Sequence, residues 1–213
     1  MPIVYQQEID AQTAIALWKI EETASELLSS LQLKPHELET VNSLGNSKRL
    51  IHWLSTRVLL RKMLNTEEYI DCRMDEHGKP FLVNFDYHIS LSHSYDYAAV
   101  MIGKDRKVGI DIELIKQKIV LIRKKFLNEH ELMHLQVDTD VDALYACWCA
   151  KEAVYKWNGI KGLEFRKDMH ISPFEAADSG KLDIAVDLQQ GRRELEVSYF
   201  KTADGYMLGY VIG

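Results

Sequence analysis

The sequence predicts an α+β fold that is built from two halves and divides near residue 104. Strand-like and helical stretches follow each other in the order strand, helices, strands, and this order occurs twice. The 213 residues are enough to bury a sizeable core. With 46% hydrophobic and 27% charged residues and no low-complexity tract, the composition is typical of a globular protein rather than a disordered or fibrous one.

The first half is expected to open with a strand over residues 3–9. One or two helices rich in Ala, Leu and Glu are predicted over 11–31, and a short helix is predicted after Pro35. From 47 to 64 the apolar residues recur with the helical period, which predicts a helix whose first turn is basic. Cations at a helix N-terminus are unfavourable unless an anion is held between them.

Two hairpins are predicted to complete the first half. The strands of the first cover 69–74 and 81–83, on either side of a Gly-Lys-Pro turn. The strands of the second cover 88–92 and 97–102, and its predicted turn contains His93. Both hairpins therefore end before the proposed division of the chain.

The second half is predicted to begin with a strand over 108–114. Helices are expected to follow over 119–136 and 143–157. Gly-containing turns then join short predicted strands at 169–171, 182–186, 195–200 and 207–212.

Charge and cysteine content set limits on function. The net charge of −6 argues against general nucleic-acid binding, so a polyanionic ligand requires a local basic patch. The residues available for such a patch are Lys48, Arg49, Arg57, Arg61 and Lys62. Cys72, Cys147 and Cys149 do not form a secreted disulfide framework, and Cys147 and Cys149 are interpreted as core residues. Because no membrane-length apolar run or signal-peptide pattern is found, we expect a cytoplasmic protein.

Asp111 and Glu113 form a D-x-E pair on the predicted strand 108–114. Side chains alternate along a strand, so both carboxylates project from one face and lie within about 7 Å of each other. Two such groups can bind one hard cation through their oxygen atoms. The alternative is an amphipathic strand with a solvated polar face, and a lone D-x-E does not decide between the two.

The predicted helix 143–157 contains only three charged residues, Lys151, Glu152 and Lys156. A helix that is apolar nearly all round is usually buried, and buried charges must be paired or bind a ligand. One interpretation is an i,i+4 ion pair between Glu152 and Lys156. The other makes Glu152 a third carboxylate that faces the D-x-E pair, with Lys156 one turn further to meet a phosphate.

Hydroxyl, imidazole and ammonium groups gather in the two predicted hairpins. The run from Ser90 to Ser94 includes Ser92 and His93, which suit phosphate oxygens. Lys79, between glycine and proline, can offer an ammonium from a tight turn. Each run is also an ordinary turn sequence, so these residues indicate a site only in combination.

His130, Glu131 and His134 match the pattern H-E-x-x-H, which on a helix can bind zinc and supply a general base. The surroundings of the motif fit poorly. The helix is short, three basic residues precede it, and neither a Gly-rich continuation nor a third ligand follows. A zinc hydrolase is therefore retained only as a minor alternative.

In combination, four blocks of the sequence resemble the 4'-phosphopantetheinyl transferase superfamily, in its longer, surfactin-type branch. In the order of the chain, the blocks are KRLIHWLSTRVLLRKML, GKP followed by ISLSHS, VGIDIE, and WCAKEAVYK. They span about residues 47–156, and G-x-D-x-E with W-x-x-K-E-x-x-x-K is specific as a pair. The family also has a helix after the acidic strand, here Phe126 to Glu131, which argues that the zinc motif is a coincidence.

The resemblance implies two similar α+β subdomains packed as a pseudo-dimer, 1–103 and 104–213, with coenzyme A between them. It implies Mg²⁺ ligands at Asp111, Glu113 and Glu152. The residues that it places on coenzyme A phosphates are Lys79, Ser92, His93 and Lys156, with Lys48 or Arg49 at the 3'-phosphate. It further implies a monomer that binds neither nucleic acid nor membrane.

The implied reaction transfers 4'-phosphopantetheine from coenzyme A to a serine of an apo acyl or peptidyl carrier protein and releases 3',5'-ADP. Glu152, or a water that it orients on the magnesium, would accept the serine proton, and Lys156 would stabilise negative charge. The alternative in which the protein is not an enzyme is a non-catalytic relative that binds coenzyme A or a carrier protein. The sequence does not identify the carrier.

Overall fold

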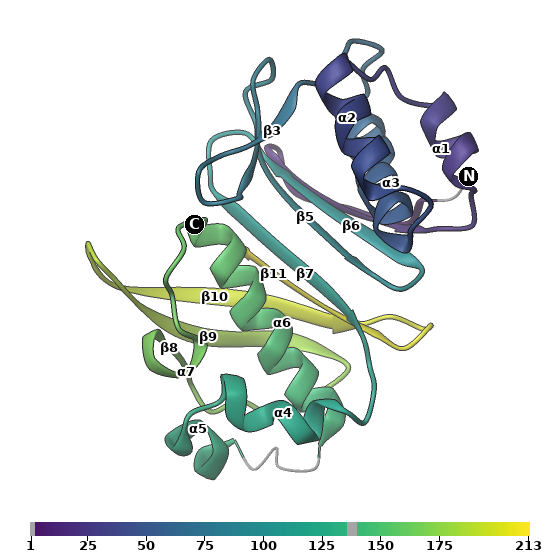
Figure 1. Cartoon of the computed structure of the whole chain (residues 1–213). Coiled ribbons are helices and arrows are strands. Elements are labelled where there is room, and N and C mark those ends of the chain that lie inside the picture. Colours follow the sequence, from purple (N-terminus) through teal and green to yellow (C-terminus); the bar gives the residue numbers. More distant parts are fainter. Residues whose placement is uncertain (1–2, 136–139) are drawn as a thin grey trace.

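The computed structural model describes residues 3–135 and 140–213, and its strands form three antiparallel sheets (Figure 1). The first sheet has the order β1 (Ile3–Asp10), β2 (Thr13–Lys19), β6 (Tyr97–Gly103), β5 (His88–Ser94). The second has the order β7 (Val108–Leu114), β11 (Tyr206–Ile212), β10 (Gly191–Lys201), β9 (Ser179–Leu188), β8 (Met169–Ile171). A small hairpin joins β3 (Cys72–Met74) to β4 (Pro80–Leu82).

Helices cover one face of each large sheet, which confirms the predicted α+β class. Those of the first sheet are α1 (Ala24–Ser29), α2 (Pro35–Leu44) and α3 (Lys48–Leu64). Those that follow β7 are α4 (Ile119–Phe126), α5 (Glu129–His134), α6 (Val141–Asn158) and α7 (Phe165–Asp168). Figure 1 shows α6 lying across the second sheet. Among the described helices, none is long and apolar enough to cross a bilayer.

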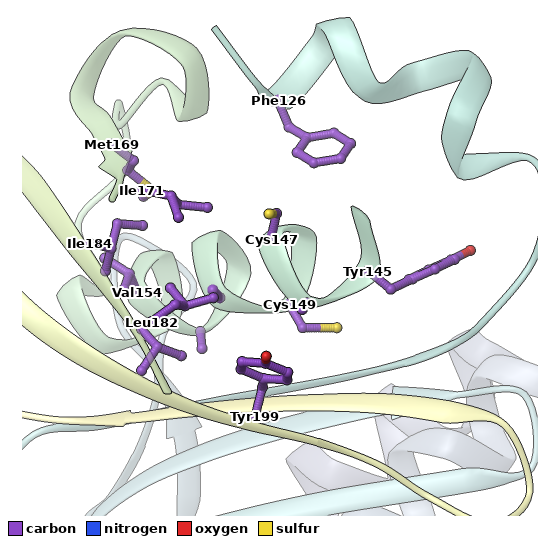
Figure 2. Close-up of a cluster of buried hydrophobic side chains, with 14 of the residues drawn as sticks. Phe126, Tyr145, Cys147, Cys149, Val154, Met169, Ile171, Leu182, Ile184 and Tyr199 are labelled. Atoms are coloured by element: carbon purple, nitrogen blue, oxygen red, sulfur yellow. The ribbon is translucent and has the colours of Figure 1, made fainter. Parts of the chain in front are cut away.

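The apolar residues form three buried clusters. One lies between α3 and the first sheet, and another lies between α6 and the second sheet (Figure 2). The third cluster joins the remaining faces of the two sheets, with Leu17 and Met101 on one side and Ile110 and Leu208 on the other. The two large sheets are therefore joined by a continuous apolar layer.

The three cysteines are free and buried, which confirms the interpretation of Cys147 and Cys149 as core residues. Cys147 and Cys149 belong to the cluster beneath α6, and Figure 2 shows their thiols pointing to different sides of the helix. Burial raises the pKa of both thiols, so both are protonated core groups.

The prediction of helices over 11–31 is wrong for its first part, because residues 13–19 form strand β2. This strand lies between β1 and β6 and is buried on both faces. Ile15 contacts the layer between the sheets, while Trp18 contacts the helices of the first half. A strand that is buried on both faces is a continuous apolar run, which periodicity alone does not separate from a helix.

Two boundaries also differ from prediction. His93 lies within β5 rather than in a turn, because Ser94 still pairs with Tyr97 and only Tyr95 and Asp96 connect the strands. The helix predicted over 119–136 is two helices, since α4 ends at Phe126 and Asn128 caps α5. Its last predicted residue, 136, lies outside the described residues.

Candidate functional site

The site lies where α6 crosses the edge strand β7. Gly109 permits the crossing, because a Cβ there would lie 2.0 Å from the carbonyl oxygen of Ala153. Gly209 on the adjacent strand β11 is also under α6, where a Cβ would lie 3.0 Å from the backbone carbonyl carbon of Cys149. Without side chains at these positions, α6 packs directly against the strand backbones. This packing brings charged residues of α6 to the carboxylates of β7.

Asp111 is the buried centre of the site and is only 4% exposed. Its Oδ1 accepts hydrogen bonds from the Ser92 hydroxyl at 2.8 Å and from the Lys156 ammonium at 2.7 Å. Its Oδ2 is buried without a hydrogen-bond partner among the described residues. Burying a carboxylate oxygen without a partner is costly, so Oδ2 is suited to accept a proton donor or a cation.

Glu113 and Glu152 lie close enough to Asp111 to increase their affinity for protons. Burial, followed by the charge of Asp111, raises the pKa of Glu113, whose Oε2 accepts a hydrogen bond from Ser94 at 2.8 Å. Burial, followed by the same charge, raises the pKa of Glu152 to about 7. The site thus brings three carboxyl groups into a region that is partly shielded from water.

The three carboxylates do not form a closed metal cage. In the described part of the chain, no three His, Cys, Asp or Glu side chains are grouped so that they could hold a metal ion. Repulsion between like charges favours this separation. Among the ion pairs of the described residues, Lys156 has Asp111 as its partner and not Glu152, so the i,i+4 pair considered from the sequence is not formed.

Alternate serines of β5 connect the first sheet to β7. Their hydroxyls accept hydrogen bonds from alternate backbone amides of β7, in the pairs Ser90 with Ile110 (3.0 Å), Ser92 with Ile112 (3.3 Å) and Ser94 with Leu114 (3.1 Å). We call these three serines and their contacts the serine seam. It turns the Ser92 hydroxyl toward β7.

A cavity of about 540 Å³ opens beside the acidic residues and is lined by both halves of the chain. The residues predicted to bind or act on the ligand that line it are Arg49, Lys79, His93, Glu152 and Lys156. Lys48 and Ser92 are not among the described residues that line this cavity. The lining of the cavity therefore combines several basic side chains with the carboxylate of Glu152.

Lys79 reaches from the first half to the end of α6, where its ammonium donates a hydrogen bond to the carbonyl of Trp157 at 2.8 Å. Gly159, with φ of +71°, leaves room for the lysine stem, since a Cβ there would lie 2.2 Å from Lys79 Cδ. Burial, followed by the nearby charge of Lys107, lowers the pKa of Lys79 to about 8. An anion in the cavity would favour the charged form.

His93 stacks on His52, with ring centroids 4.2 Å apart. His52 is fixed in turn by a contact of 2.7 Å between its Nε2 and the carbonyl oxygen of Tyr95. Burial, and then the proximity of His52, lowers the pKa of His93 to about 4. At neutral pH His93 is therefore a neutral hydrogen-bonding group rather than a cation.

Arg57 is a cavity residue that sequence analysis placed only in the general basic patch. Its guanidinium lies 3.6 Å from the ring centroid of Trp53, and its Nη1 donates to the Trp53 carbonyl at 3.2 Å. Its Nε is buried without a hydrogen-bond partner among the described residues. The helical spacing of 53 and 57 was visible in the sequence, but nothing in the sequence showed that this face meets the cavity.

The H-E-x-x-H residues do not form a described metal site. Glu131 is 1% exposed and pairs with Lys151, whose ammonium lies 2.7 Å from its Oε1. The same carboxylate accepts hydrogen bonds from the backbone amides of Asn128 and Ile171. Glu131 is thus bound within the protein core, while the side chain of His134 lies outside the described residues.

Lys151 is the buried charge whose role the sequence left open. Its ammonium also donates to the backbone carbonyls of Phe126 (2.9 Å), Phe165 (2.8 Å) and Met169 (3.0 Å). It therefore connects α6 to the segments around α4, α7 and β8. The signal in the sequence was a lysine on the apolar side of a buried helix, but its partners are distant along the chain.

The chain is similar to known proteins of one family. The family model of the 4'-phosphopantetheinyl transferase superfamily matches residues 107–211. The 4'-phosphopantetheinyl transferase gsp of Aneurinibacillus migulanus is 35% identical over 127 residues, which cover 58% of this chain and 52% of that protein. The 4'-phosphopantetheinyl transferase of Bacillus subtilis is 28% identical over 139 residues, which cover 63% and 59% of the two chains.

A third relative, the 4'-phosphopantetheinyl transferase AcpT of Salmonella typhi, is 32% identical over 117 residues, which cover 52% of this chain and 60% of that protein. The chain thus spans about half to three fifths of the length of these relatives. The segment matched by the family model contains β7 with its two carboxylates and α6 with Glu152 and Lys156. By this match and these relatives, residues 107–211, about half of the chain, are similar to the 4'-phosphopantetheinyl transferase superfamily.

Proposed function

We propose that the protein transfers 4'-phosphopantetheine from coenzyme A to a serine of an apo acyl or peptidyl carrier protein. The observation that carries the proposal is the position of Glu152 and Lys156 in the lining of a basic cavity, with Lys156 paired to Asp111 of the adjacent strand β7. A polyphosphate needs cations along its length, and a metal at its pyrophosphate needs carboxylates. The relatives named above bear the name of this activity.

The chemistry of the acidic residues suits a divalent cation, and we propose that Mg²⁺ draws Asp111, Glu113 and Glu152 together as its ligands, since these side chains are not grouped around a metal position in the described structure. The Oδ2 atom of Asp111 is buried without a hydrogen-bond partner among the described residues, and a cation would satisfy it. Burial, and then the charge of the neighbouring carboxylates, raises the pKa of Glu152 to about 7, and a cation would offset the repulsion among the carboxylates. When bound, the ion supplies a Lewis acid for the pyrophosphate oxygens.

The basic walls fit the phosphates of coenzyme A. Lys79, His93 and Lys156 line the cavity, and we propose that they contact the pyrophosphate. Arg49 also lines the cavity, which favours Arg49 over Lys48 for the 3'-phosphate. Because His93 is neutral at neutral pH, we expect it to donate a hydrogen bond without adding charge.

In the proposed reaction the serine oxygen of the carrier forms a bond to the phosphorus next to pantetheine. The bond from that phosphorus to the 3',5'-ADP oxygen breaks. Glu152 accepts the serine proton as a general base. Lys156 stabilises the negative charge that spreads over the phosphoryl oxygens, and positioning supplies most of the remaining acceleration.

The protein is proposed to be a cytoplasmic monomer built from two halves. We propose that 1–103 and 104–213 are the two halves, because each has its own sheet and helix layer. A monomer is expected, since the cavity already receives residues from both halves. We propose a cytoplasmic location, and the three free buried cysteines fit a reducing compartment.

The test is mass spectrometry of purified apo carrier proteins after incubation with this protein, coenzyme A and Mg²⁺. Representatives of fatty-acid, polyketide and peptide carriers should be compared, because the carrier is not identified. The expected result is one added phosphopantetheine per carrier and none with a carrier whose acceptor serine is replaced by alanine. Tight binding of coenzyme A without transfer to any carrier would instead support a non-catalytic relative.

A further inference from the structure

We propose that Ser92 and Ser94 are positioning residues that fix the metal-binding carboxylates through the serine seam. The proposal rests on the proposed function, because it assigns these serines to the metal site of the transferase. It departs from the sequence-based expectation that Ser92 contacts a phosphate. The contacts of the hydroxyl groups carry it.

The seam joins two strands that belong to different sheets. β5 is the edge of the first sheet and β7 is the edge of the second. Each of the three serine hydroxyls accepts a hydrogen bond from a backbone amide of β7, at 3.0 to 3.3 Å. Side chains thus connect the backbones where two separate sheets meet. Because side chains alternate along a strand, every second residue of β5 faces β7. The serines therefore recur at the same spacing of two residues as the β7 amides that they contact.

The protons of two seam hydroxyls go to the carboxylates. Ser92 donates to Asp111 Oδ1 and Ser94 donates to Glu113 Oε2, each at 2.8 Å. A serine hydroxyl has one proton, so neither of them has a second proton to donate to a phosphate. Ser92 and Ser94 therefore each accept a hydrogen bond from a backbone amide of β7 and donate one to a carboxylate of β7.

This arrangement matters because the carboxylates repel each other. A carboxylate without a fixed donor would turn toward solvent, away from its acidic neighbours. The seam serines are buried, with Ser92 5% and Ser94 6% exposed. A buried and satisfied hydrogen bond is more rigid than one in water, so the donors preorganise Asp111 and Glu113 for a cation.

Ser90 provides a matched control within the same seam. It is 2% exposed and accepts a hydrogen bond from the amide of Ile110, as the other two serines do from their amides. Within the described residues, no contact of Ser90 with a carboxylate is found. Ser90→Ala therefore removes a seam contact alone, while Ser94→Ala removes a seam contact and the donor to Glu113.

The experiment measures the binding of Mn²⁺ alone to the full chain by electron paramagnetic resonance, with the thermal unfolding midpoint of every variant. Both alanine variants should unfold at lower temperature than the wild type. Ser94→Ala should weaken Mn²⁺ binding by about tenfold, which is the usual effect of removing a group that orients a metal ligand. Ser90→Ala should change Mn²⁺ affinity by less than about twofold, and Ser94→Thr, which keeps a hydroxyl, should restore binding.

The outcomes separate this proposal from the proposed function. Equal Mn²⁺ affinity in Ser94→Ala and the wild type would overturn the positioning role and leave the transferase proposal intact. Equal weakening of Mn²⁺ binding in Ser90→Ala and Ser94→Ala would have the same consequence. A wild-type protein that binds no Mn²⁺ and modifies no carrier would overturn both. If Ser94→Ala does not fold, Ser92→Ala, which removes the donor to Asp111, is measured with the same expectation.

Discussion

Burial controls the charge of Lys79, the residue that spans the cavity and the end of α6. Its pKa is lowered to about 8, whereas an exposed lysine titrates near 10.4. A phosphate beside the ammonium would raise this pKa again. Binding of coenzyme A is then coupled to proton uptake in the pH range between about 8 and the higher pKa of the complex, where the lysine is mostly neutral in the free protein and mostly charged in the complex.

The affinity for coenzyme A should therefore fall as the pH rises, by about tenfold between pH 7 and pH 9. The measurement is calorimetry of coenzyme A binding in several buffers, which also reports the proton taken up. Lys79→Arg keeps its charge throughout this range and should make the affinity nearly independent of pH. A profile that is equally steep in Lys79→Arg would show that another group titrates.

Glu152 is the carboxylate that the proposed mechanism uses as the base. Glu152→Gln keeps the size of the side chain but removes both the base and a metal ligand. We expect a loss of transfer of at least about a hundredfold, the usual contribution of general base catalysis. The assay is the rate of carrier modification by mass spectrometry, with circular dichroism as the control for folding. Full activity would exclude this residue from the reaction.

At the scale of elements, the close packing of α6 on β7 and β11 depends on two glycines, Gly109 and Gly209. Gly109→Ala places a methyl group against the carbonyl of Ala153, which belongs to the helix backbone. Helix and strand must then separate, at a cost of about 1–3 kcal/mol in the free energy of unfolding. Gly209→Ala, with a wider spacing of 3.0 Å, should cost less. Urea unfolding of both variants checks the order, which the reverse ranking would contradict.

Lys151 holds the elements around α6 through a buried ion pair and three carbonyls. Lys151→Met leaves Glu131 buried without its partner and should destabilise the protein by about 3–5 kcal/mol. Combining it with Glu131→Gln should cost less than the sum of the single changes, because the uncompensated charge is removed. Chemical unfolding of the four members of this cycle provides the measurement. Additive costs would mean that the pair is not coupled.

At the scale of the whole molecule, the two sheets share one apolar layer. Ile15 and Met101 of the first sheet meet Val108 and Ile112 of the second within a single buried cluster. Opening either half would expose the inner face of the other to water, at a cost of about 25 cal/mol for each Å² of apolar surface. The halves should therefore unfold together.

Tryptophan fluorescence can test this cooperativity, because each half contains two tryptophans. Trp18 and Trp53 lie in the first half, and Trp148 and Trp157 lie in the second. Variants that keep the tryptophans of only one half, with phenylalanine at the other two positions, should each lose fluorescence at the same urea concentration as they lose circular dichroism. Two well-separated transitions within one variant would show that the halves are independent.

Much of the fold could be predicted from local patterns. The helix over 143–157 and the four tail strands were predicted close to their observed bounds, because their periodicity and turn residues are local properties. Strand β2 was missed, since burial on both faces removes the alternation that identifies a strand. The position of His93 within β5 was missed as well, because the length of the connection depends on strand pairing.

The sequence by itself determined the α+β class, the paired acidic residues on one strand and the resemblance to the transferase superfamily, because these depend on order and spacing along the chain. Only the tertiary structure decided that Lys156 pairs with Asp111, that Ser92 and Ser94 hold the carboxylates, and that Lys151 is bound in the core. The physical reason is that hydrogen bonds and charges act over a few ångströms in space. Their partners here lie some twenty to forty-five residues apart in the chain and meet only after folding.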